Sequence, residues 1–249
     1  MLKWILCLFG LVIPTSHLFA HHRSFSEKDQ KAKHYSFSKR HHRQSTGKSY
    51  MGREIAEVMG PAGIPWLERP TRLHEEHLSQ LITNMKLSPN SVVADIGAGS
   101  GRISQMIAEQ LGQKGKVYAV EIQDKMIAAI KKRMEESKQK LAIVPIKGTI
   151  TTVPIKARTV DMALLVDVYH EFSHPREMIQ SIVKSLKPGG HLILVEYRAE
   201  DPKVPIKRLH KMSMKQIQKE INQTLYPLTL YRHLKNLPRQ HMVVFKKHR

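Results

Sequence analysis

The chain has 249 residues, enough for one domain with a full hydrophobic core. Lys and Arg outnumber Asp and Glu by 41 to 21, and the net charge of +20 fits either an anionic partner or solvated basic segments. The single cysteine excludes a disulfide framework within the chain. The basic excess lies at the ends, with eight Lys and Arg against two acids in residues 21–50 and twelve against one in residues 203–249.

Residues 1–20 have the pattern of a secretory signal or membrane-targeting segment. Lys3 precedes an apolar run, and a small-residue site ends at Ala20. The apolar run is shorter than the roughly 20 residues that a spanning helix needs. We therefore expect a periplasmic, secreted or membrane-associated protein. Because many Lys and Arg follow the run, the positive-inside tendency supports the alternative, a cytoplasmic protein.

Two segments precede the regular part of the chain. Residues 21–49 are rich in His, Ser, Lys and Arg, and this composition predicts a basic disordered segment. Residues 50–249 form the expected domain. Its first part, residues 50–73, contains short helical stretches interrupted by Gly and Pro, which indicates a cap or lid laid over the core. Trp66 and Arg69 are the candidate contacts of this cap, although simple packing explains them equally well.

From Thr71 onward the apolar pattern predicts alternating helices and strands. A first helix begins at Thr71, and the later helix near 204–223 precedes two strands whose short connection predicts antiparallel pairing. The alternation between them indicates a parallel sheet with right-handed crossovers. The expected strands are 91–96, 116–121, 142–147, 160–168, 189–197, 228–235 and 242–247, and the other helices are 101–111, 123–138 and 174–187.

The most informative motif is a glycine-rich turn after the first of these strands. A β-branched apolar run ends at Asp95, and three glycines alternate at Gly97, Gly99 and Gly101. Such a strand–turn–helix junction lets the backbone approach a ligand closely. The dinucleotide fingerprint requires a third glycine where Arg102 stands, so the spacing favours another nucleoside-like ligand over NAD.

A second acid supports a nucleoside ligand. Glu121 ends the next expected strand, 24 residues after Gly97, close to the roughly 20 that nucleotide sites show. An acid at this position accepts hydrogen bonds from both ribose hydroxyls. An exposed Glu at a strand end is also common, but the glycine turn makes the ribose role the better interpretation.

With these motifs, the chain resembles the class I S-adenosylmethionine-dependent methyltransferases over about residues 74–247. Two further stretches carry the resemblance, Leu164-Leu-Val-Asp-Val168 and Leu186-Lys-Pro-Gly-Gly190. Residues 169–175, 195–202 and 237–241 are similar to a bacterial subfamily of largely unassigned substrate. The resemblance implies an α/β, Rossmann-like fold with a seven-stranded, mostly parallel sheet, an antiparallel last strand and helices on both faces.

The resemblance also implies S-adenosyl-L-methionine as the cofactor. Asp95 and the three glycines would hold its amino-acid end, and Glu121 would hold its ribose. Ile122 would pack on the adenine. Many relatives have an Asp for the adenine amino group after the third strand, where this chain has Thr149 or backbone atoms instead. Asp167, at the end of the fourth strand, completes the expected cofactor-binding set.

The segment after the fourth strand should face the transferred methyl group, because ligands bind beyond the carboxyl ends of parallel strands. His170 titrates near neutrality and is the first candidate for a catalytic base, with Glu171 as the second. Tyr169 is a candidate for orienting the acceptor. Local hydrogen bonding within a loop is the alternative explanation for each of the three.

The same segment contains a His-Glu-x-x-His sequence from His170 to His174. A zinc peptidase presents both histidines on one helix face. Pro175 follows His174 directly and disfavours helical angles there, so the zinc-peptidase interpretation fails. We expect no metal, and a different metal site formed by His170, Glu171 and His174 stays as an alternative.

The sequence therefore predicts transfer of a methyl group to a small-molecule acceptor. No Asn-Pro-Pro-Tyr-type run follows the fourth strand, and that stretch looks more like small-molecule methyltransferases, such as those of quinone synthesis. One alternative is a non-catalytic binding protein with a degenerate site. In either case the basic flanks offer contacts to an anionic surface, a membrane or a nucleic acid. A less favoured alternative is an NAD-dependent oxidoreductase.

Overall fold

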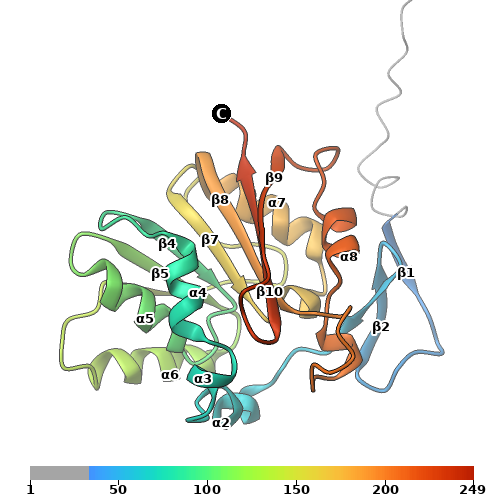
Figure 1. The fold of residues 1–249 in the computed structure, drawn as a ribbon, viewed down its shortest axis with the longest axis horizontal. Coiled ribbons are helices and arrows are strands. Elements are labelled where there is room, and N and C mark those ends of the chain that lie inside the picture. Colours follow the sequence, from blue (N-terminus) through green and yellow to red (C-terminus); the bar gives the residue numbers. More distant parts are fainter. Residues whose placement is uncertain (1–33) are drawn as a thin grey trace, which may run out of the picture. The chain divides into compact units, whose positions relative to one another are not determined.

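Seven strands form the central sheet of the computed structural model, which describes residues 34–249 (Figure 1). The segment predicted as a signal, residues 1–20, and the first part of the basic segment lie outside the described residues. Within residues 34–249, every helix is too short or too polar to cross a bilayer.

The strand order of this sheet is β6-β5-β4-β7-β8-β10-β9, and only β10 runs antiparallel to its neighbours. The predicted fold class is therefore confirmed. Because β5 and β7 pair with opposite sides of β4, their following loops diverge and leave a crevice at the carboxyl ends. The strands are β4 (Val92–Ile96), β5 (Lys116–Glu121), β6 (Ile143–Lys147), β7 (Val160–Val166), β8 (Leu186–Tyr197), β9 (Leu228–Leu234) and β10 (Gln240–Lys247).

Helices cover both faces of the sheet, and a separate hydrophobic cluster fills each interface. One cluster joins the sheet to α4 and α5, with Ile130 of α6, and the other joins it to α7 and α8. In α5 the buried side chains recur at helical spacing, which is why this segment forms an amphipathic helix. The helices are α4 (Leu78–Met85), α5 (Arg102–Leu111), α6 (Asp124–Glu135), α7 (Pro175–Ser185) and α8 (Met214–Glu220).

Two predicted helices are shorter than expected. The helix predicted from Thr71 divides into α3 (Arg72–Glu75) and α4, because His77 between them has a left-handed backbone with φ of 50°. The helix predicted over 204–223 is reduced to the short turn η3 (Arg208–His210) and α8. Between these two, Met212 forms an isolated β-bridge with Arg198, and its N–H donates to the carbonyl of Tyr197 at 2.9 Å.

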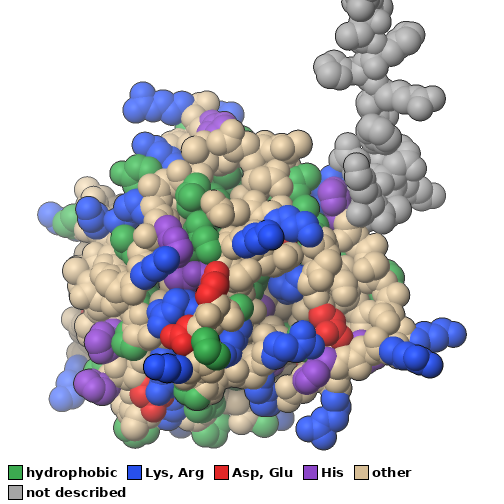
Figure 2. Space-filling view, turned by 45° about the vertical axis from the view of Figure 1, so that its right-hand side comes forward, with side chains coloured by type: hydrophobic (Ala, Val, Ile, Leu, Met, Phe, Trp, Pro, Cys, Tyr) green, Lys and Arg blue, Asp and Glu red, His purple; other side chains and the backbone are tan. Residues whose placement is uncertain are grey.

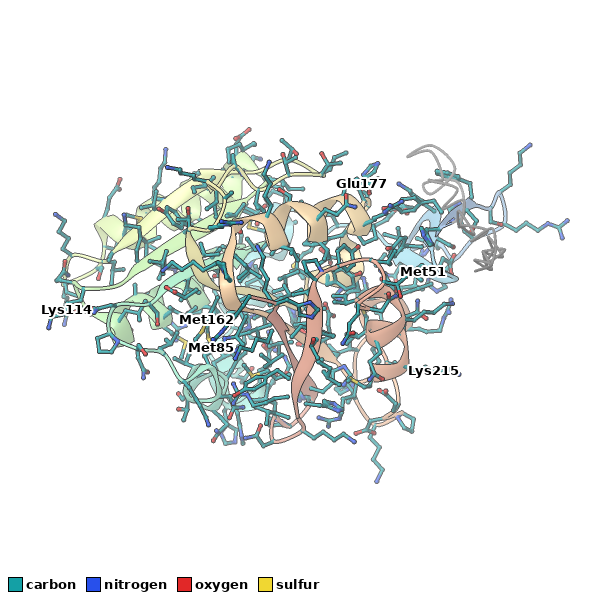
Figure 3. All side chains as sticks on the ribbon, turned by 90° about the horizontal axis from the view of Figure 1, so that it is seen from above. Met51, Met85, Lys114, Met162, Glu177 and Lys215 are labelled. Carbon is teal, nitrogen blue, oxygen red and sulfur yellow. The ribbon has the colours of Figure 1, made fainter. Side chains whose placement is uncertain are left out.

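A second, three-stranded sheet corrects the prediction of disorder over residues 21–49 in its described part. Its strands are β1 (Tyr35–Phe37), β2 (Ser45–Tyr50) and β3 (Arg53–Ala56). The large side chains that this sheet buries completely, Tyr50 and Ile55, come from the residues just after the segment predicted to be disordered. The Tyr35 hydroxyl donates to Glu177 of α7 at 2.7 Å, and Figure 3 shows Glu177 on the side of the molecule where this sheet lies.

Candidate functional site

A cavity of about 610 Å³ lies at the carboxyl ends of the parallel strands, where the strand order reverses. Its walls include the residues that directly follow β4, β5 and β7, together with part of the segment predicted as a cap. The volume falls in the range typical of pockets for small ligands and cofactors. The position and size together make this cavity the candidate active site.

The glycine turn forms one wall of the cavity. Gly97 and Gly99 line it, whereas Gly101 packs against Ile130 of α6. Gly97 has φ of +71°, and a Cβ there would lie 2.5 Å from Cγ2 of Val168. Only glycine accepts this backbone angle and also leaves room for the Val168 side chain, which follows β7, to approach so closely. Gly97 and Gly99 therefore lie where the sequence predicted them, whereas Gly101 lies outside the cavity lining and differs from its predicted role.

Glu121 lies at the wall next to the glycine turn, as predicted. Its carboxylate accepts backbone N–H bonds from Gly99 at 3.0 Å, Ile122 at 2.7 Å and Gln123 at 3.0 Å. Burial raises the pKa of Glu121 above its ordinary value, against the opposing effect of these donors. The donors fix the carboxylate at the cavity surface, where it can accept further hydrogen bonds from a ligand.

The two positions predicted near the adenine also line the cavity. Ile122 contributes an apolar surface beside Glu121. The Thr149 hydroxyl is engaged in its own turn, where it accepts N–H bonds from Thr151 at 3.2 Å and Thr152 at 3.0 Å. We therefore assign Thr149 to the cavity wall, with its hydroxyl directed by the turn.

Asp95 is placed differently from its predicted role. It is buried behind the glycine turn, outside the cavity lining, and accepts a hydrogen bond from the Ser104 hydroxyl at 2.5 Å. Burial raises its pKa to about 6. Asp95 thus ties the end of β4 to α5, and it acts on the ligand wall through the position of the turn.

Asp167 lines the cavity as predicted, with a left-handed backbone of φ 50°. Its Oδ2 accepts a hydrogen bond from the Gln240 side chain at 3.0 Å, but its buried Oδ1 has no partner among the described residues. Burial, followed by the charges of Glu76 and Glu196, raises the pKa of Asp167 well above its ordinary value. An unpaired buried carboxylate oxygen at a cavity wall suits a donor or cation on a ligand.

His170 and Glu171 line the cavity, and His210 joins them from a distant part of the chain. The first two belong to the turn η2 (Tyr169–Glu171), and His210 ends η3. His170 Nε2 lies 3.0 Å from His210 Nδ1, and Glu171 Oε1 lies 3.4 Å from His210 Nδ1 and 3.8 Å from His170 Nε2. We refer to these three residues as the His–Glu–His cluster.

His174 does not take part in this cluster. It lies at the start of α7, where its Nδ1 is 3.0 Å from the Ser173 hydroxyl and its ring stacks edge-on near Tyr35. The alternative metal site built from His170, Glu171 and His174 is therefore wrong in its third member. The sequence showed no sign of His210, because its contact with His170 spans 40 residues.

Glu196, near the end of β8, contacts the ring of His170 on the side away from the cluster. It is completely buried, accepts the Tyr169 N–H at 2.9 Å and lies 2.6 Å from His170 Nδ1. Burial lowers the pKa of His170, but Glu196 and Glu171 outweigh this effect and hold it above the ordinary value. A glutamate directly after the apolar run of residues 192–195 was the available sequence signal for this residue.

Tyr169, the third predicted catalytic residue, lies in the core rather than in the cavity lining. Its hydroxyl donates to Glu220 of α8 at 2.8 Å. Arg53 of β3 binds both oxygens of the same Glu220 at 2.7 and 2.9 Å and donates to the carbonyl of His170 at 3.0 Å. The position of Tyr169 thus supports a structural role beneath η2 and not contact with an acceptor.

The segment predicted as a cap does border the cavity. Met59, Trp66 and Leu67 line it, and the last two belong to α2 (Ile64–Leu67), which follows the short turn η1 (Pro61–Gly63). The Met59 N–H donates to Glu171 Oε2 at 3.1 Å, and its carbonyl accepts from Gln123 at 2.9 Å. The cap therefore contacts both ends of the cavity.

Residues 94–194 match the family model described as a methyltransferase domain. The chain is 24% identical over 110 residues to the ubiquinone/menaquinone biosynthesis C-methyltransferase UbiE of Wigglesworthia glossinidia brevipalpis, with 44% of each protein covered. It is 28% identical over 146 residues to a protein-lysine N-methyltransferase of Saccharolobus islandicus, covering 58% of this chain and 84% of that protein. The chain spans about half the length of the UbiE relatives that it matches.

The solved structures show the same fold. A SAM-dependent methyltransferase from Aquifex aeolicus aligns with a TM-score of 0.70 at 20% identity and covers 76% of this chain and 99% of that chain. The [4+2]-cyclase SpnF aligns with a TM-score of 0.58 at 13% identity and covers 69% of this chain and 81% of that chain. The fold thus carries more than one chemistry, and the chemistry of this chain has to be argued from its own cavity.

Proposed function

We propose that this chain is a class I S-adenosylmethionine-dependent methyltransferase that transfers a methyl group to a small-molecule acceptor, and the domain match and the fold support this proposal. The observation that carries the proposal is the shared cavity. Its wall joins the glycine turn and Glu121, which suit a nucleoside cofactor, to His170 and Glu171, which suit a reacting acceptor.

The residues of the cavity fit this cofactor at both of its ends. The fixed carboxylate of Glu121 offers acceptor oxygens for the two ribose hydroxyls, and Ile122 offers an apolar surface for the adenine. At the other end, the unpaired Oδ1 of Asp167 suits the ammonium group of the amino-acid part. Asp95 supports this wall from behind by its bond to Ser104.

The cofactor, when bound, would supply a methyl group on a sulfonium, and the corresponding neutral thioether is the leaving group. The chain then has to align the acceptor in line with the methyl–sulfur bond and keep water out. The cap contributes to the enclosure through Met59, Trp66 and Leu67. A protic acceptor would also have to lose a proton, and His170 or Glu171 at the cavity wall would take it.

Three observations favour a small acceptor. The cavity is within the size range of sites for single small ligands, and the cofactor would share it with the acceptor. On the face shown in Figure 2, Lys and Arg side chains are scattered and do not line one continuous groove. The name of the UbiE relatives points the same way, because it describes a C-methyltransferase of quinone biosynthesis. Binding of an anionic surface by the basic flanks stays a prediction.

Calorimetry tests the cofactor part of this proposal. The full chain should bind S-adenosylmethionine, and Glu121→Ala should weaken binding about 100-fold, because charge-assisted hydrogen bonds to the ribose are worth roughly 1.5–3 kcal/mol each. Glu109→Ala, on the exposed surface of α5, is the matched control and should bind like the wild type. Tighter binding of NAD would support an oxidoreductase. If neither ligand binds, a degenerate binding protein becomes the better explanation.

Transfer of label tests the acceptor class. The protein would be incubated with methyl-labelled S-adenosylmethionine and a fractionated cell extract. We expect label in the small-molecule fraction, and its loss with the Glu121→Ala variant. Label that enters only the protein or nucleic-acid fraction would overturn the small-molecule acceptor while leaving methyl transfer intact.

A further inference from the structure

The His–Glu–His cluster brings three metal-ligating atoms together at the cavity wall. His170 Nε2, Glu171 Oε1 and His210 Nδ1 all lie within 4.8 Å of one another. His170 and Glu171 are buried and His210 is partly exposed, so the cluster faces the cavity with one open side. Two imidazoles and one carboxylate are ligands that divalent transition metals share, among them Zn²⁺.

The spacing of these atoms matches a tetrahedral site. With metal–ligand distances of about 2.0–2.1 Å, the ligand atoms of a tetrahedron lie about 3.3 Å apart. The three separations in the cluster are 3.0, 3.4 and 3.8 Å, and they scatter around that value. Cis ligands of an octahedral ion would lie closer, at about 2.9 Å. The geometry thus favours an ion of the zinc type with a fourth position open.

Partners outside the cluster fix the orientation of two ligands. Glu196 lies 2.6 Å from His170 Nδ1, so a proton held there leaves the lone pair of Nε2 directed at the cluster. The Met59 N–H holds Glu171 Oε2 at 3.1 Å, which leaves Oε1 for the cluster. A carboxylate behind a metal-binding imidazole is the usual arrangement of such sites.

We propose that His170, Glu171 and His210 bind one divalent transition-metal ion, of the zinc type, at the acceptor end of the cavity. The fourth position takes an ionisable oxygen of the acceptor, such as a phenol or an enol. This second statement rests on the proposed function, whereas metal binding by the three residues does not. A hydrogen bond between the two imidazoles is the competing explanation of the 3.0 Å separation.

The proposed ion gives the acceptor a route to ionisation. A metal-bound oxygen loses its proton to solvent more readily than a free one. The ionised acceptor then forms a bond to the methyl carbon as the methyl–sulfur bond breaks, and a neutral thioether leaves. No group is oxidised or reduced, so the step needs no other reactant. His170 would then act as a ligand and not as the base that the sequence suggested.

Equilibrium dialysis of the full chain against Zn²⁺, after treatment with a chelator, tests the metal site directly. The chain has 15 histidines, so metal content is compared between the wild type and its variants. His210→Ala and Glu171→Gln should each lose one equivalent of tightly bound Zn²⁺. His174→Ala and the double variant His41→Ala/His42→Ala are matched controls, because they remove histidines outside the cluster, and they should keep it. Equal metal content in the wild type and His210→Ala would overturn the proposal.

Cobalt substitution gives a second readout that does not depend on activity. Co²⁺ bound to the wild type should show the intense visible absorption of a tetrahedral site, and His210→Ala should lose it. An octahedral spectrum would contradict the inferred geometry. A protein that binds S-adenosylmethionine but takes up neither Zn²⁺ nor Co²⁺ at the cluster would overturn this inference and leave the proposed function standing. Metal binding without any methyl transfer would keep the site and overturn the role in the acceptor's chemistry.

Discussion

The two ends of the cavity are built in different ways. Most of the cofactor end comes from one stretch of chain, Asp95 to Gln123, where glycines and a carboxylate held by backbone N–H groups form the surface, and Asp167 is added from the end of β7. The acceptor end joins side chains from β3, η2, β8, η3 and α8, and it depends on buried charges. A wall formed by backbone takes its shape once the strand and the turn fold. A wall formed by side chains keeps its shape only while every distant partner is present, so we expect single substitutions to disrupt it more easily.

The sharpest way to break the acceptor end is Arg53→Met. Both side chains of the Arg53–Glu220 pair are buried, with exposed fractions of 10% and 0%. Removing the arginine leaves the buried Glu220 without its counter-charge, although the Tyr169 hydroxyl still donates to it, and this costs about 3–5 kcal/mol of the free energy of unfolding. Urea denaturation measures this change. Arg208→Met is the control, because Arg208 is 71% exposed in its pair with Glu54, and it should change the value by less than about 1 kcal/mol.

The double variant Arg53→Met/Glu220→Leu separates charge from position. Removing both charges should restore most of the stability. The carbonyl of His170 would still lack its donor at 3.0 Å, so methyl transfer should stay reduced. If Arg53→Met alone unfolds at the urea concentration of the wild type, the acceptor end does not depend on this pair.

The same contrast decides what the sequence could predict. The glycine turn and Glu121 are local motifs, and the sheet follows from apolar runs of the right length, so both were predicted within a few residues. The positions of His170 and Glu171 at the cavity were predicted from the end of β7. These features share one property: their signal lies in neighbouring residues.

The parts that were missed depend on contacts between distant residues. His210 reaches His170 across 40 residues, and Glu196 reaches it across 26. The N-terminal sheet holds so few apolar residues that its composition resembles a disordered segment, yet its aromatic and basic side chains find partners on α7 and α8. Composition averages over a segment, whereas a few well-placed contacts are enough to order it.

His170→Ala sharpens the comparison, because it should affect only one end of the cavity. We expect methyl transfer to fall about 10²- to 10³-fold, whether the imidazole acts as a base or as a metal ligand. The dissociation constant for S-adenosylmethionine should change less than about twofold, since the glycine turn and Glu121 are untouched. Kinetics and calorimetry on the same preparation measure both values, and a thermal melt checks that the variant is folded.

An equal loss of cofactor affinity and of turnover in His170→Ala would contradict this separation. Glu121→Ala is the reciprocal variant. It should weaken the binding of S-adenosylmethionine, and its Zn²⁺ content should equal that of the wild type. Each variant should therefore change the property of its own end of the cavity and leave the property of the other end unchanged, so that each serves as the control for the other.

Asp95→Asn probes the cofactor end from behind, through its pH dependence. The carboxyl of Asp95 has a pKa of about 6 in the folded chain against an ordinary 3.8. Between these values the unfolded chain loses the proton and the folded chain keeps it, so rising pH lowers the stability of the wild type. Asn cannot ionise. The stability of Asp95→Asn relative to the wild type should therefore grow by about 2–3 kcal/mol from pH 4 to pH 7.

Urea denaturation of both proteins across this pH range, without cofactor, provides the measurement. Asp124→Asn is the control, because this carboxylate is exposed and its ion pair within residues 34–249 is with the half-exposed Lys147. Its difference from the wild type should stay nearly constant with pH. A constant difference for Asp95→Asn would mean that the buried carboxyl ionises as readily in the folded chain as in the unfolded one.

The smallest effect is expected at the cap, where Trp66→Ala should weaken S-adenosylmethionine binding about fivefold. Trp66 lines the cavity but is 44% exposed, so its removal costs only part of the apolar contact that a buried ring provides. The Arg69 guanidinium lies 3.6 Å from the centre of the ring and would lose this support, although its bonds to Glu75 and Glu76 remain. Calorimetry measures the change, with Trp66→Phe as the control that keeps an aromatic wall. A hundredfold loss of affinity in Trp66→Ala would show that the cap, and not the backbone of the glycine turn, supplies most of the cofactor affinity. The cap would then be a third wall of the cavity, to be compared with its two ends.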